Sequence, residues 1–418
     1  MINSGIPWVK AIPSHWKCRR IEELFIESVQ KNIFYEFDHA LKFTYGELVP
    51  KDEEGDVSEL KGTYLAYSII DKDDIAINGL NLNFDFVSQR VARCPQRGIL
   101  TSAYLILKPK DKRYSRYYTY LFKSWDYQKV FHGMGKGVRL TLSFAELKKK
   151  LIPVPPMGEL LKIADFLDEM VAEIDTAITE AQFLIDKYKT YKQSVITQTV
   201  TKGLNTDVQM KDSCIPWIGD IPLHWRTDKV KYHLEINEYK GYPDAKVLSL
   251  YRDLGVIPKD SRDDNHNVTS EDTSKYKHVD VGNFVVNKMK AWQGSVAVSN
   301  YEGIVSPAYY VYKFSSNAFC KEYFHYLLRD KSYTPEFRRL SGGIREGQWD
   351  LSREGFRNIP VIIPPLEEQQ MIADYLDKKT KEIDAIITQK EKLVSLLQDY
   401  KKSIIFEYVT GKKEVPNG

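Results

Sequence analysis

The longest hydrophobic pattern in the chain runs without proline or glycine from Glu159 to Lys202. Its apolar residues step alternately by four and by three positions, which is the spacing of a coiled-coil seam. Prolines precede this stretch and Gly203 follows it, as is typical of helix boundaries. The sequence therefore predicts one long helix, roughly 60 Å in length if straight. The seam consists of Ile163, Leu167, Met170, Ile174, Ala177, Ala181, Leu184, Tyr188, Tyr191 and Val195.

The same helical pattern occurs again 209 residues further along the chain. The stretch Ile-Ala-Asp-Phe-Leu-Asp at 163–168 returns as Ile-Ala-Asp-Tyr-Leu-Asp at 372–377, and Glu-Ile-Asp at 173–175 returns at 382–384. Two unrelated amphipathic helices would not share identities at one fixed offset, so a duplication is favoured. The second seam includes Ile372, Leu376, Ile383, Leu393 and Tyr400.

A tryptophan-rich segment precedes each globular region and shows the same offset. Residues 6–16 contain Trp8, His15 and Trp16, and residues 215–225 repeat this pattern. The 418-residue chain is therefore one unit written twice: a tryptophan-rich segment, a globular region and a long helix. Because a tryptophan-rich segment follows the first helix, the second helix should end near residue 1. The two helices should then pair in antiparallel orientation.

The globular regions, roughly 17–152 and 226–359, alternate short β-rich runs with polar turns, for example at 104–107 and 309–312. Helical segments are expected at 114–131 and 318–328. The predicted class is α+β: two globular α/β domains separated by a pair of long antiparallel coiled-coil helices, with a pseudo-two-fold internal repeat. The expected boundaries are 1–152 for the first globular domain, 153–205 for the central helix, 206–359 for the second globular domain and 360–418 for the C-terminal helix.

Composition places few limits on function. The net charge is +3, and the four cysteines form no CxxC pair, which disfavours a zinc cluster or a disulfide framework. No apolar run approaches the length of a membrane span, so we expect a cytoplasmic protein. Phosphate-binding GxxxxGK[ST], dinucleotide-binding GxGxxG and metalloprotease HExxH motifs are all missing, as is the Asn-Pro-Pro-Tyr/Phe motif of amino-methyltransferases.

Charge is distributed unevenly within the first globular region. Residues 86–150 contain 15 Lys and Arg against 3 Asp and Glu, whereas residues 22–85 contain 5 against 15. The second region shows the same direction more weakly, with 11 basic and 7 acidic residues over 286–357. A basic segment interleaved with aromatic residues suits a phosphate backbone. A solvated basic face, or contact with an acidic partner, remains the alternative.

Residue types that read base edges or hold phosphates cluster in two parts of each region. Lys136, Arg139 and Arg345 lie in or beside glycine-rich loops, where the backbone can approach a partner closely. Trp125, Trp292 and Trp349 are more typical of a core than of stacking platforms. The candidate DNA-binding residues are Asn78, Asn81, Asn83, Gln89, Arg90, Lys136 and Arg139 in the first region, and Asn287, Lys288, Lys290, Gln293 and Arg345 in the second.

The layout strongly resembles the specificity subunit of type I restriction-modification systems. The resemblance rests on the two helical motifs at 163–168 and 372–377, on their Pro-rich starts, on Val-Thr-Lys-Gly and Val-Thr-Gly at their ends, and on the Ile-Pro-x-x-Trp segments. It implies that each globular region reads one half of a split target in double-stranded DNA. It also implies that the helices dock two adenine-methylating modification subunits, and that the complex recruits ATP-driven restriction subunits.

By the same resemblance, this subunit performs no chemistry and holds no cofactor or metal, because S-adenosylmethionine, ATP and magnesium belong to the partners. Candidate partner-binding residues are the seam positions Ile163, Leu167, Ile174, Leu184, Tyr191, Ile372, Leu376, Ile383, Leu393 and Tyr400. A coiled-coil adaptor between proteins, with only non-specific DNA contact, is the alternative. A stand-alone nuclease or methyltransferase is disfavoured by the missing motifs.

Overall fold

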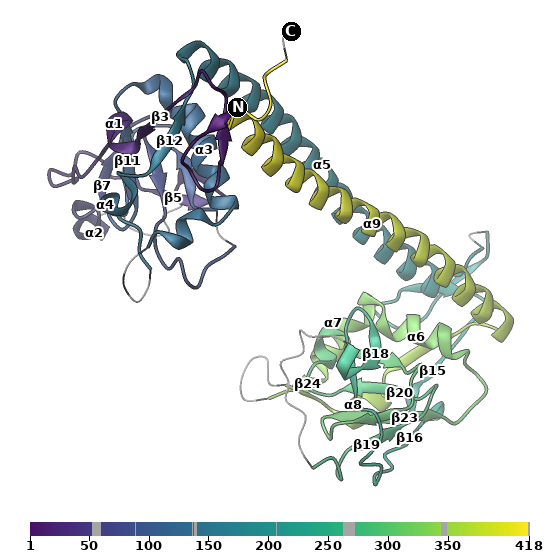
Figure 1. The fold of residues 1–418 in the computed structure, drawn as a ribbon. Helices are drawn as coiled ribbons and strands as arrows, with labels where there is room; N and C mark the ends of the chain where they lie inside the picture. Colours follow the sequence, from purple (N-terminus) through teal and green to yellow (C-terminus); the bar gives the residue numbers. More distant parts are fainter. Residues whose placement is uncertain are drawn as a thin grey trace. The chain divides into compact units, whose positions relative to one another are not determined.

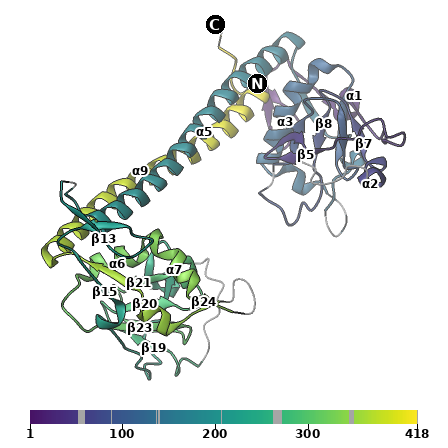
Figure 2. The same cartoon turned by 180° about the vertical axis from the view of Figure 1, so that it is seen from behind.

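The computed structural model of the chain describes residues 1–418 apart from 52–59, 88, 136, 138–139, 206, 262–271, 344–348 and 417–418. The chain forms two compact units (Figures 1 and 2). Unit 1 consists of Met1–Gln182 together with Lys392–Gly418, and unit 2 consists of Phe183–Glu391. Both units contain parts of the long helices α5 (Met157–Lys202) and α9 (Leu366–Val409). The predicted α+β class with two long helices is therefore confirmed.

A four-stranded antiparallel sheet in the order β4-β11-β8-β9 forms the centre of unit 1. Two-stranded sheets β5-β6, β10-β7, β12-β3 and β1-β2 accompany it. The strands are β1 (Ile2–Asn3), β2 (Ala11–Ile12), β3 (Lys17–Arg20), β4 (Phe25–Glu27), β5 (Leu41–Thr44), β6 (Glu47–Pro50), β7 (Ser68–Ile70), β8 (Ile75–Ile77), β9 (Val91–Arg93), β10 (Gly98–Leu100), β11 (Leu105–Pro109) and β12 (Leu151–Val154). The helices are α1 (Ile21–Leu24), α2 (Lys61–Leu65), α3 (Ser115–Tyr127) and α4 (Phe144–Leu147), with short 3₁₀ turns at Lys112–Tyr114 and Val130–Gly133.

Both faces of this central sheet are buried, so its inner strands are apolar at consecutive positions and not only at alternate ones. Ile75 and Ile77 of β8 belong to the hydrophobic cluster that contains the apolar side of α3. Ala76, which points to the opposite face, belongs to a second cluster with Leu41 of β5 and Leu48 of β6. The central sheet is thus sandwiched between α3 and the smaller sheets.

Unit 2 repeats this topology with the central order β16-β23-β20-β21. Its inner strand β20 again divides its side chains between two clusters, with Phe284 and Val286 on one face and Val285 on the other. The duplication therefore extends to the globular regions. The strands are β13 (Met210–Asp212), β14 (Asp220–Pro222), β15 (Arg226–Lys229), β16 (Leu234–Ile236), β17 (Leu248–Tyr251), β18 (Gly255–Pro258), β19 (Lys277–Val279), β20 (Phe284–Asn287), β21 (Val296–Val298), β22 (Gly303–Val305), β23 (Tyr309–Phe314), β24 (Ser341–Gly342), β25 (Asp350–Leu351) and β26 (Pro360–Ile363). The helices are α6 (Lys321–Arg329), α7 (Thr334–Arg339) and α8 (Arg353–Arg357), with 3₁₀ turns at Val230–Tyr232, Lys259–Ser261, Ala291–Gln293 and Lys331–Tyr333.

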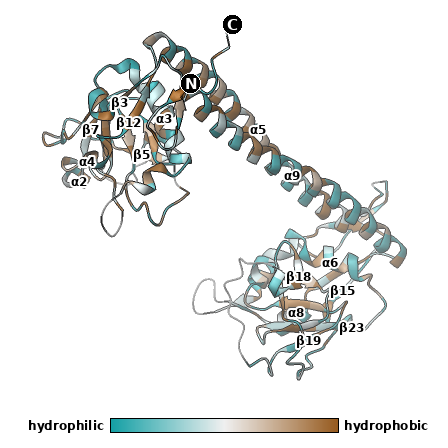
Figure 3. Cartoon of the chain, in the orientation of Figure 1, coloured by the Kyte–Doolittle hydropathy of each residue, from teal (hydrophilic) through white to brown (hydrophobic). Residues whose placement is uncertain are grey.

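The two long helices pair in antiparallel orientation within each unit, as the repeat predicts. In unit 1, Lys401 Nζ of α9 lies 2.6 and 2.7 Å from the two carboxylate oxygens of Asp175 in α5. In unit 2, Lys192 Nζ of α5 lies 2.8 and 2.6 Å from those of Asp384 in α9. The two ion pairs occupy equivalent positions of the repeat. Figure 3 shows hydrophobic and hydrophilic residues alternating along both helices.

A buried tyrosine hydroxyl fixes the end of each long helix to a globular domain. Tyr117 of α3 donates to the carbonyl of Val409 at 2.7 Å, and Tyr323 of α6 donates to that of Val200 at 3.0 Å. Burial raises the pKa of both hydroxyls well above the ordinary tyrosine value, so both are protonated donors at neutral pH. Each bond satisfies a carbonyl that a helix end leaves without an intrahelical partner.

A second tyrosine fixes the beginning of each helix. Tyr120 donates to Asp168 of α5 at 2.7 Å, and Tyr326 donates to Asp377 of α9 at the same distance. Each globular domain therefore contacts the start of one long helix and the end of the other.

The N-terminal segment packs against the end of α9 within unit 1, which confirms the predicted circular order. Gly411 follows α9 with a φ of +66°, and a Cβ atom added there would lie 2.4 Å from Pro13 Cδ. Only glycine fits this position without a shift of the neighbouring backbone. The cluster of buried residues at this junction includes Ile6, Val9, Ile12, Trp16, Ile404, Ile405, Tyr408 and Val409.

The seam residues do not all have the role that the resemblance implied. Six of the ten are buried inside the chain, so they pack its own core and do not present a partner surface: Ile163, Leu167, Ile174, Ile372, Leu376 and Ile383. The apolar positions of a paired helix are largely covered by the other helix and by the domains attached to it. Leu184, Tyr191, Leu393 and Tyr400 are exposed.

We expect Ile174→Ala to lower the free energy of unfolding by about 3 kcal/mol, because it leaves a cavity at a side chain that is 5% exposed. Leu184→Ala, at a seam position that is 40% exposed, should change it by less than about 1 kcal/mol. Urea unfolding of the full chain followed by circular dichroism measures both. Equal losses for the two variants would contradict the assignment of Ile174 to the core.

Candidate nucleic-acid interface

Two loops that are far apart in the sequence meet in unit 1. The first connects β8 to β9 over residues 78–90, and the second follows the 3₁₀ turn at Val130–Gly133. The backbone N–H of Leu142 donates to Gly79 O at 2.9 Å, and that of Leu82 donates to Leu140 O at 3.3 Å. A Cβ atom at Gly79 would lie 2.8 Å from Leu142 Cβ, so glycine is required for this approach. The β8–β9 loop and the glycine-rich loop therefore form one surface.

Unit 2 contains the equivalent pair of loops. The first lies between β20 and β21, and the second joins α7 to α8 and includes β24 and β25. The backbone N–H of Leu351 donates to Lys288 O at 2.8 Å, which is the contact of Leu142 with Gly79 moved by 209 residues. Lys288 Nζ also lies 2.8 Å from Asp350 Oδ2. The backbone contact is the same in the two units, but the residue that accepts it is glycine in unit 1 and lysine in unit 2.

Arg90 supports the β8–β9 loop from inside and is not available to DNA. Its side chain is 0% exposed, and its guanidinium donates to three backbone carbonyls of the loop. Nη1 lies 3.0 Å from Asn78 O and 2.7 Å from Leu80 O, and Nη2 lies 2.7 Å from Asp85 O. The backbone N–H of Arg90 donates to the buried carboxylate of Asp126 at 2.7 Å. The predicted DNA contact of Arg90 is therefore replaced by a structural role.

The electrostatics beneath the loop follow from this burial. Desolvation raises the pKa of Asp126 above its ordinary value, and the N–H of Arg90 opposes that shift. A buried carboxylate and a buried guanidinium are costly unless they are hydrogen-bonded, and here Asp126 Oδ2 and both terminal nitrogens of Arg90 are, whereas Asp126 Oδ1 and Arg90 Nε are not. The molecule therefore fixes the shape of a surface loop with charged groups that never reach the surface.

The other predicted residues of unit 1 divide into turn-forming and exposed side chains. Asn78 Oδ1 accepts the backbone N–H of Leu80 at 3.2 Å, so this side chain shapes the start of the loop. Asn81, with a φ of +52°, and Gln89 are exposed on the loop, and Asn83 is half-buried. Lys136 and Arg139 lie outside the described residues.

In unit 2, Asn287 repeats the role of Asn78, because its buried Oδ1 accepts the N–H of Met289 at 3.2 Å. Lys288 is half-buried in its ion pair with Asp350. Lys290 and Gln293 are exposed on the β20–β21 loop. Arg345 lies outside the described residues. The structure thus brings the described candidates of each region onto one pair of loops, with Asn81 and Gln89 exposed in unit 1 and Lys290 and Gln293 in unit 2.

Aromatic side chains at both loop pairs were not among the predicted site residues. Phe84 and Phe86 are exposed on the β8–β9 loop of unit 1, and Phe86 stacks on His132 with ring centroids 4.7 Å apart. The segment from Asn81 to Phe86 alternates polar and apolar residues, which by itself is the pattern of a half-buried strand. Only the loop geometry shows that these rings face solvent.

The tryptophans of unit 2 correct a second expectation. Trp292 and Trp349 are half-buried neighbours at the loop pair, with ring centroids 5.5 Å apart, and the guanidinium of Arg338 lies 5.6 Å from the Trp349 ring. Trp125, in contrast, is fully buried in the core as predicted. An aromatic pair with an adjacent cation is suited to stacking and to phosphate attraction.

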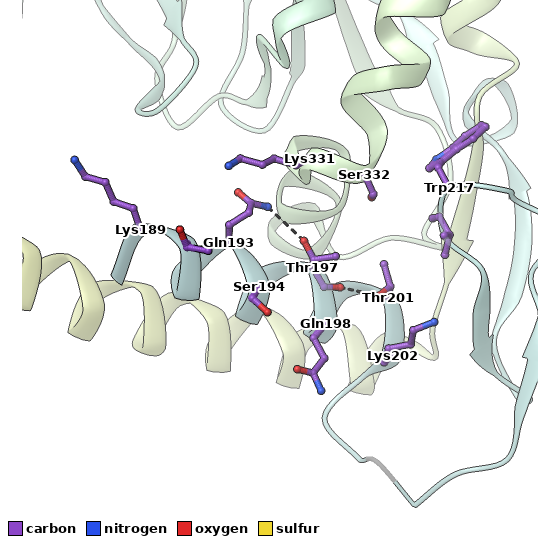
Figure 4. Close-up of a pocket in the computed structure, with 12 residues that line it drawn as sticks. Lys189, Gln193, Ser194, Thr197, Gln198, Thr201, Lys202, Trp217, Lys331 and Ser332 are labelled. Atoms are coloured by element: carbon purple, nitrogen blue, oxygen red, sulfur yellow. Dashed lines mark hydrogen bonds between the residues drawn. The ribbon is translucent and has the colours of Figure 1, made fainter. Parts of the chain in front are cut away.

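A cleft of about 600 Å³ lies elsewhere in unit 2, along the C-terminal part of α5 (Figure 4). Two of its polar lining residues, Gln193 and Thr197, contact Asp330 at its edge. The carboxylate of Asp330 accepts hydrogen bonds from Gln193 Nε2 at 2.9 Å and from Thr197 Oγ1 at 2.5 Å. These two hydrogen bonds join α5 to the segment before α7.

The described ranges of the chain lack metal-binding clusters and membrane-spanning helices. No cluster of three or more His, Cys, Asp or Glu side chains there is placed to bind a metal ion. None of the helices in the same ranges combines the length and the hydropathy that a bilayer-spanning segment needs. Burial lowers the pKa of His325 to about 3, and its Nδ1 accepts the N–H of Val298, so this imidazole serves the fold.

Comparison with known proteins agrees with this geometry. A family profile described as the type I restriction modification DNA specificity domain matches residues 225–395. The MjaVIII specificity subunit of Methanocaldococcus jannaschii is 25% identical over 366 residues, which cover 84% of this chain and 81% of that protein. The chain is thus similar to type I restriction-modification specificity subunits over most of its length. The putative MjaX specificity subunit of the same organism is 24% identical over 74% of this chain and 71% of that protein.

Solved structures share the fold of this chain. A chain from a study of complex assembly and conformational transition of the type I R-M system superposes with a TM-score of 0.72 at 14% identity, covering 96% of this chain and 100% of that one. The HsdS subunit from Thermoanaerobacter tengcongensis gives a TM-score of 0.52 at 14% identity, covering 96% and 98%. The fold is therefore retained while most residues differ.

We expect Arg90→Ala to lower the free energy of unfolding by about 3 kcal/mol, because it leaves buried carbonyls without their charged donor. Differential scanning calorimetry of the full chain measures this loss. Gln89→Ala, at the exposed neighbouring position, is the control and should leave the melting temperature within about 1 °C. An Arg90→Ala protein that melts like the wild type would contradict the structural role.

Proposed function

We propose that this specificity subunit reads a split DNA target, with the paired loops of unit 1 reading one part and those of unit 2 reading the other. The observation that carries the proposal is the duplicated loop contact, Leu142 to Gly79 and Leu351 to Lys288, on which the two units place unlike side chains. A common scaffold positions both readers, and the differing side chains make the two parts of the target different. The target is therefore asymmetric.

Each reader combines polar side chains suited to base edges with cationic or aromatic groups suited to the backbone. In unit 2, exposed Lys290 and Gln293 lie on the loop beside the Trp292–Trp349 pair and Arg338. Glutamine can make two hydrogen bonds to adenine in the major groove, and lysine can donate to guanine or to phosphate. The uneven charge of the first globular region provides the attraction to DNA that does not depend on sequence.

The subunit performs no chemistry of its own in this proposal. Two modification subunits supply adenine methylation with S-adenosylmethionine, and restriction subunits supply the ATP- and magnesium-dependent steps. The exposed seam residues Leu184 and Tyr191 recur as Leu393 and Tyr400. One apolar surface on α5 and its equivalent on α9 can thus bind two identical partners in the same way.

Lys290→Ala with Gln293→Ala should relax recognition in one part of the target only. We expect the discrimination against mismatched bases there to fall by about 1–3 kcal/mol per lost contact, with the other part unchanged. Sequencing of methylated adenines in cells that carry the full system measures both parts at once. Lys313→Ala, which removes an exposed lysine from β23 of the same unit, is the matched control.

The outcome of that experiment separates the reader from the adaptor. A wild-type complex that methylates without any sequence preference would favour the adaptor with only non-specific DNA contact. Relaxation of both parts by the Lys290 and Gln293 changes would contradict the assignment of one part to each unit.

Tyr191→Ser and Tyr400→Ser should each release one of the two modification subunits, because each removes an apolar side chain from one of the two equivalent surfaces. Analytical ultracentrifugation of the mixed subunits measures the stoichiometry, and the double variant should bind neither. Tyr301→Ser, at an exposed tyrosine in the loop before β22, is the control. Unchanged mass of all three complexes would show that the modification subunits dock elsewhere.

A further inference from the structure

The tip of the β8–β9 loop in unit 1 consists of unusually exposed apolar side chains. Phe84 is 76% exposed, Phe86 is 55% exposed and Val87 is 92% exposed. Scattered exposed hydrophobic residues are normal, but neighbouring ones on a single loop mark a binding surface. This tip is distinct from the polar side chains that the proposed function uses.

Several interactions hold the tip in one shape. The backbone N–H groups of Phe84 and Asp85 both donate to Asn81 O, at 3.1 and 3.2 Å, and form a turn. The N–H of Val87 donates to the side chain of Asp85 at 3.1 Å. Because the turn is already formed, the tip loses little conformational entropy when it binds. The loop thus presents the apolar side chains in a prepared arrangement.

Two groups lock this turn from below. The buried guanidinium of Arg90 donates to Asp85 O at 2.7 Å. His132 lies under the ring of Phe86 at 4.7 Å, and its Nε2 is 3.1 Å from the same carbonyl. The charged brace and the aromatic stack leave the outer side of the tip free for contact with a partner.

The repeat indicates what kind of partner contacts the tip. A surface for a protein that binds both halves alike would recur 209 residues further on. The equivalent loop of unit 2 is four residues shorter, because Asn78 corresponds to Asn287 at an offset of 209, whereas Gly98 corresponds to Gly303 at 205. The tip is therefore specific to unit 1, as expected for a group that reads one part of an asymmetric target.

Charge identifies the same partner. The tip lies at the start of a segment, residues 86–150, whose sequence contains 15 basic and 3 acidic residues. Such a segment attracts a polyanion, and DNA also offers apolar groups to an approaching ring. These are the 5-methyl groups of thymine in the major groove and the faces of bases at a step that can be opened.

We propose that Phe84 and Phe86 form an apolar reader that contacts bases in the part of the target assigned to unit 1. This inference rests on the proposed function and names the chemistry of one reader. The specificity of unit 1 then depends on apolar contact, whereas that of unit 2 depends on Lys290, Gln293 and the tryptophan pair.

The test uses the full specificity subunit assembled with its modification subunits, and fluorescence anisotropy on target and on random duplexes over a range of salt concentrations. We expect Phe84→Ala and Phe86→Ala each to weaken binding to the target about tenfold and to leave binding to random DNA unchanged. The salt dependence should be unchanged too, because an apolar contact releases no counterions. Phe34→Ala, at a phenylalanine that is 80% exposed in another loop of unit 1, is the matched control.

Modified targets identify the apolar group on the DNA. If the rings contact thymine methyl groups, replacing thymine by uracil in the unit 1 part should weaken wild-type binding and should not weaken Phe84→Ala binding further. If a ring enters a base step, 2-aminopurine placed there should fluoresce more brightly with wild type than with Phe86→Ala. Either result supports the proposal.

Two outcomes would overturn it. Target affinity that stays at the wild-type value in both phenylalanine variants would show that the tip does not touch the bases. A loss shared equally by target and random DNA would show a general contact. A wild-type complex without target preference would instead refute the proposed function, so the two failures are distinguishable.

Discussion

The hydrogen bonds from buried tyrosines to the ends of the long helices are the interactions on which the rest of the structure depends. Tyr117 reaches the last turn of α9 and Tyr323 reaches the last turn of α5, in both cases inside a hydrophobic cluster. Each bond gives a carbonyl at a helix end a hydrogen-bond partner. It also fixes the orientation of the globular domain on that helix. Since the paired loops are built on the sheet beneath these tyrosines, the helix ends set where each reader points.

The sequence predicted most of this framework because the framework is repeated. One offset relates the seams, the tryptophan-rich segments and the ion pairs Lys192–Asp384 and Lys401–Asp175, and this offset also required the helices to be antiparallel. The helix expected at 114–131 is shorter than predicted, because α3 ends at Tyr127 and Lys129 adopts a left-handed conformation. Hydrophobic periodicity alone does not record such a local change of backbone direction.

The site was predicted less completely, for a physical reason. Residue type indicated that Arg90 suits DNA, but a guanidinium binds backbone carbonyls as readily as guanine, and only the fold decides which it meets. Phe84 and Trp292 were missed as surface groups because aromatic residues are usually buried. The seam residues Ile163 and Leu376 were predicted to bind partner proteins, although they are buried within the chain. A heptad pattern shows that a helix face is apolar but not whether the same chain or another protein packs against that face. In each case tertiary contacts decided the role of the side chain.

The division of the chain into units has a consequence for its synthesis. Unit 2 is one continuous stretch, Phe183–Glu391, whereas unit 1 also needs Lys392–Gly418, which are synthesised after all of unit 2. Residues 1–182 are synthesised first, yet the hydrophobic cluster that contains Ile6, Val9 and Trp16 is complete only when Ile405 and Val409 have been added. Unit 1 is thus begun before unit 2 and completed after it, and a chain that ends before α9 would leave these apolar side chains uncovered.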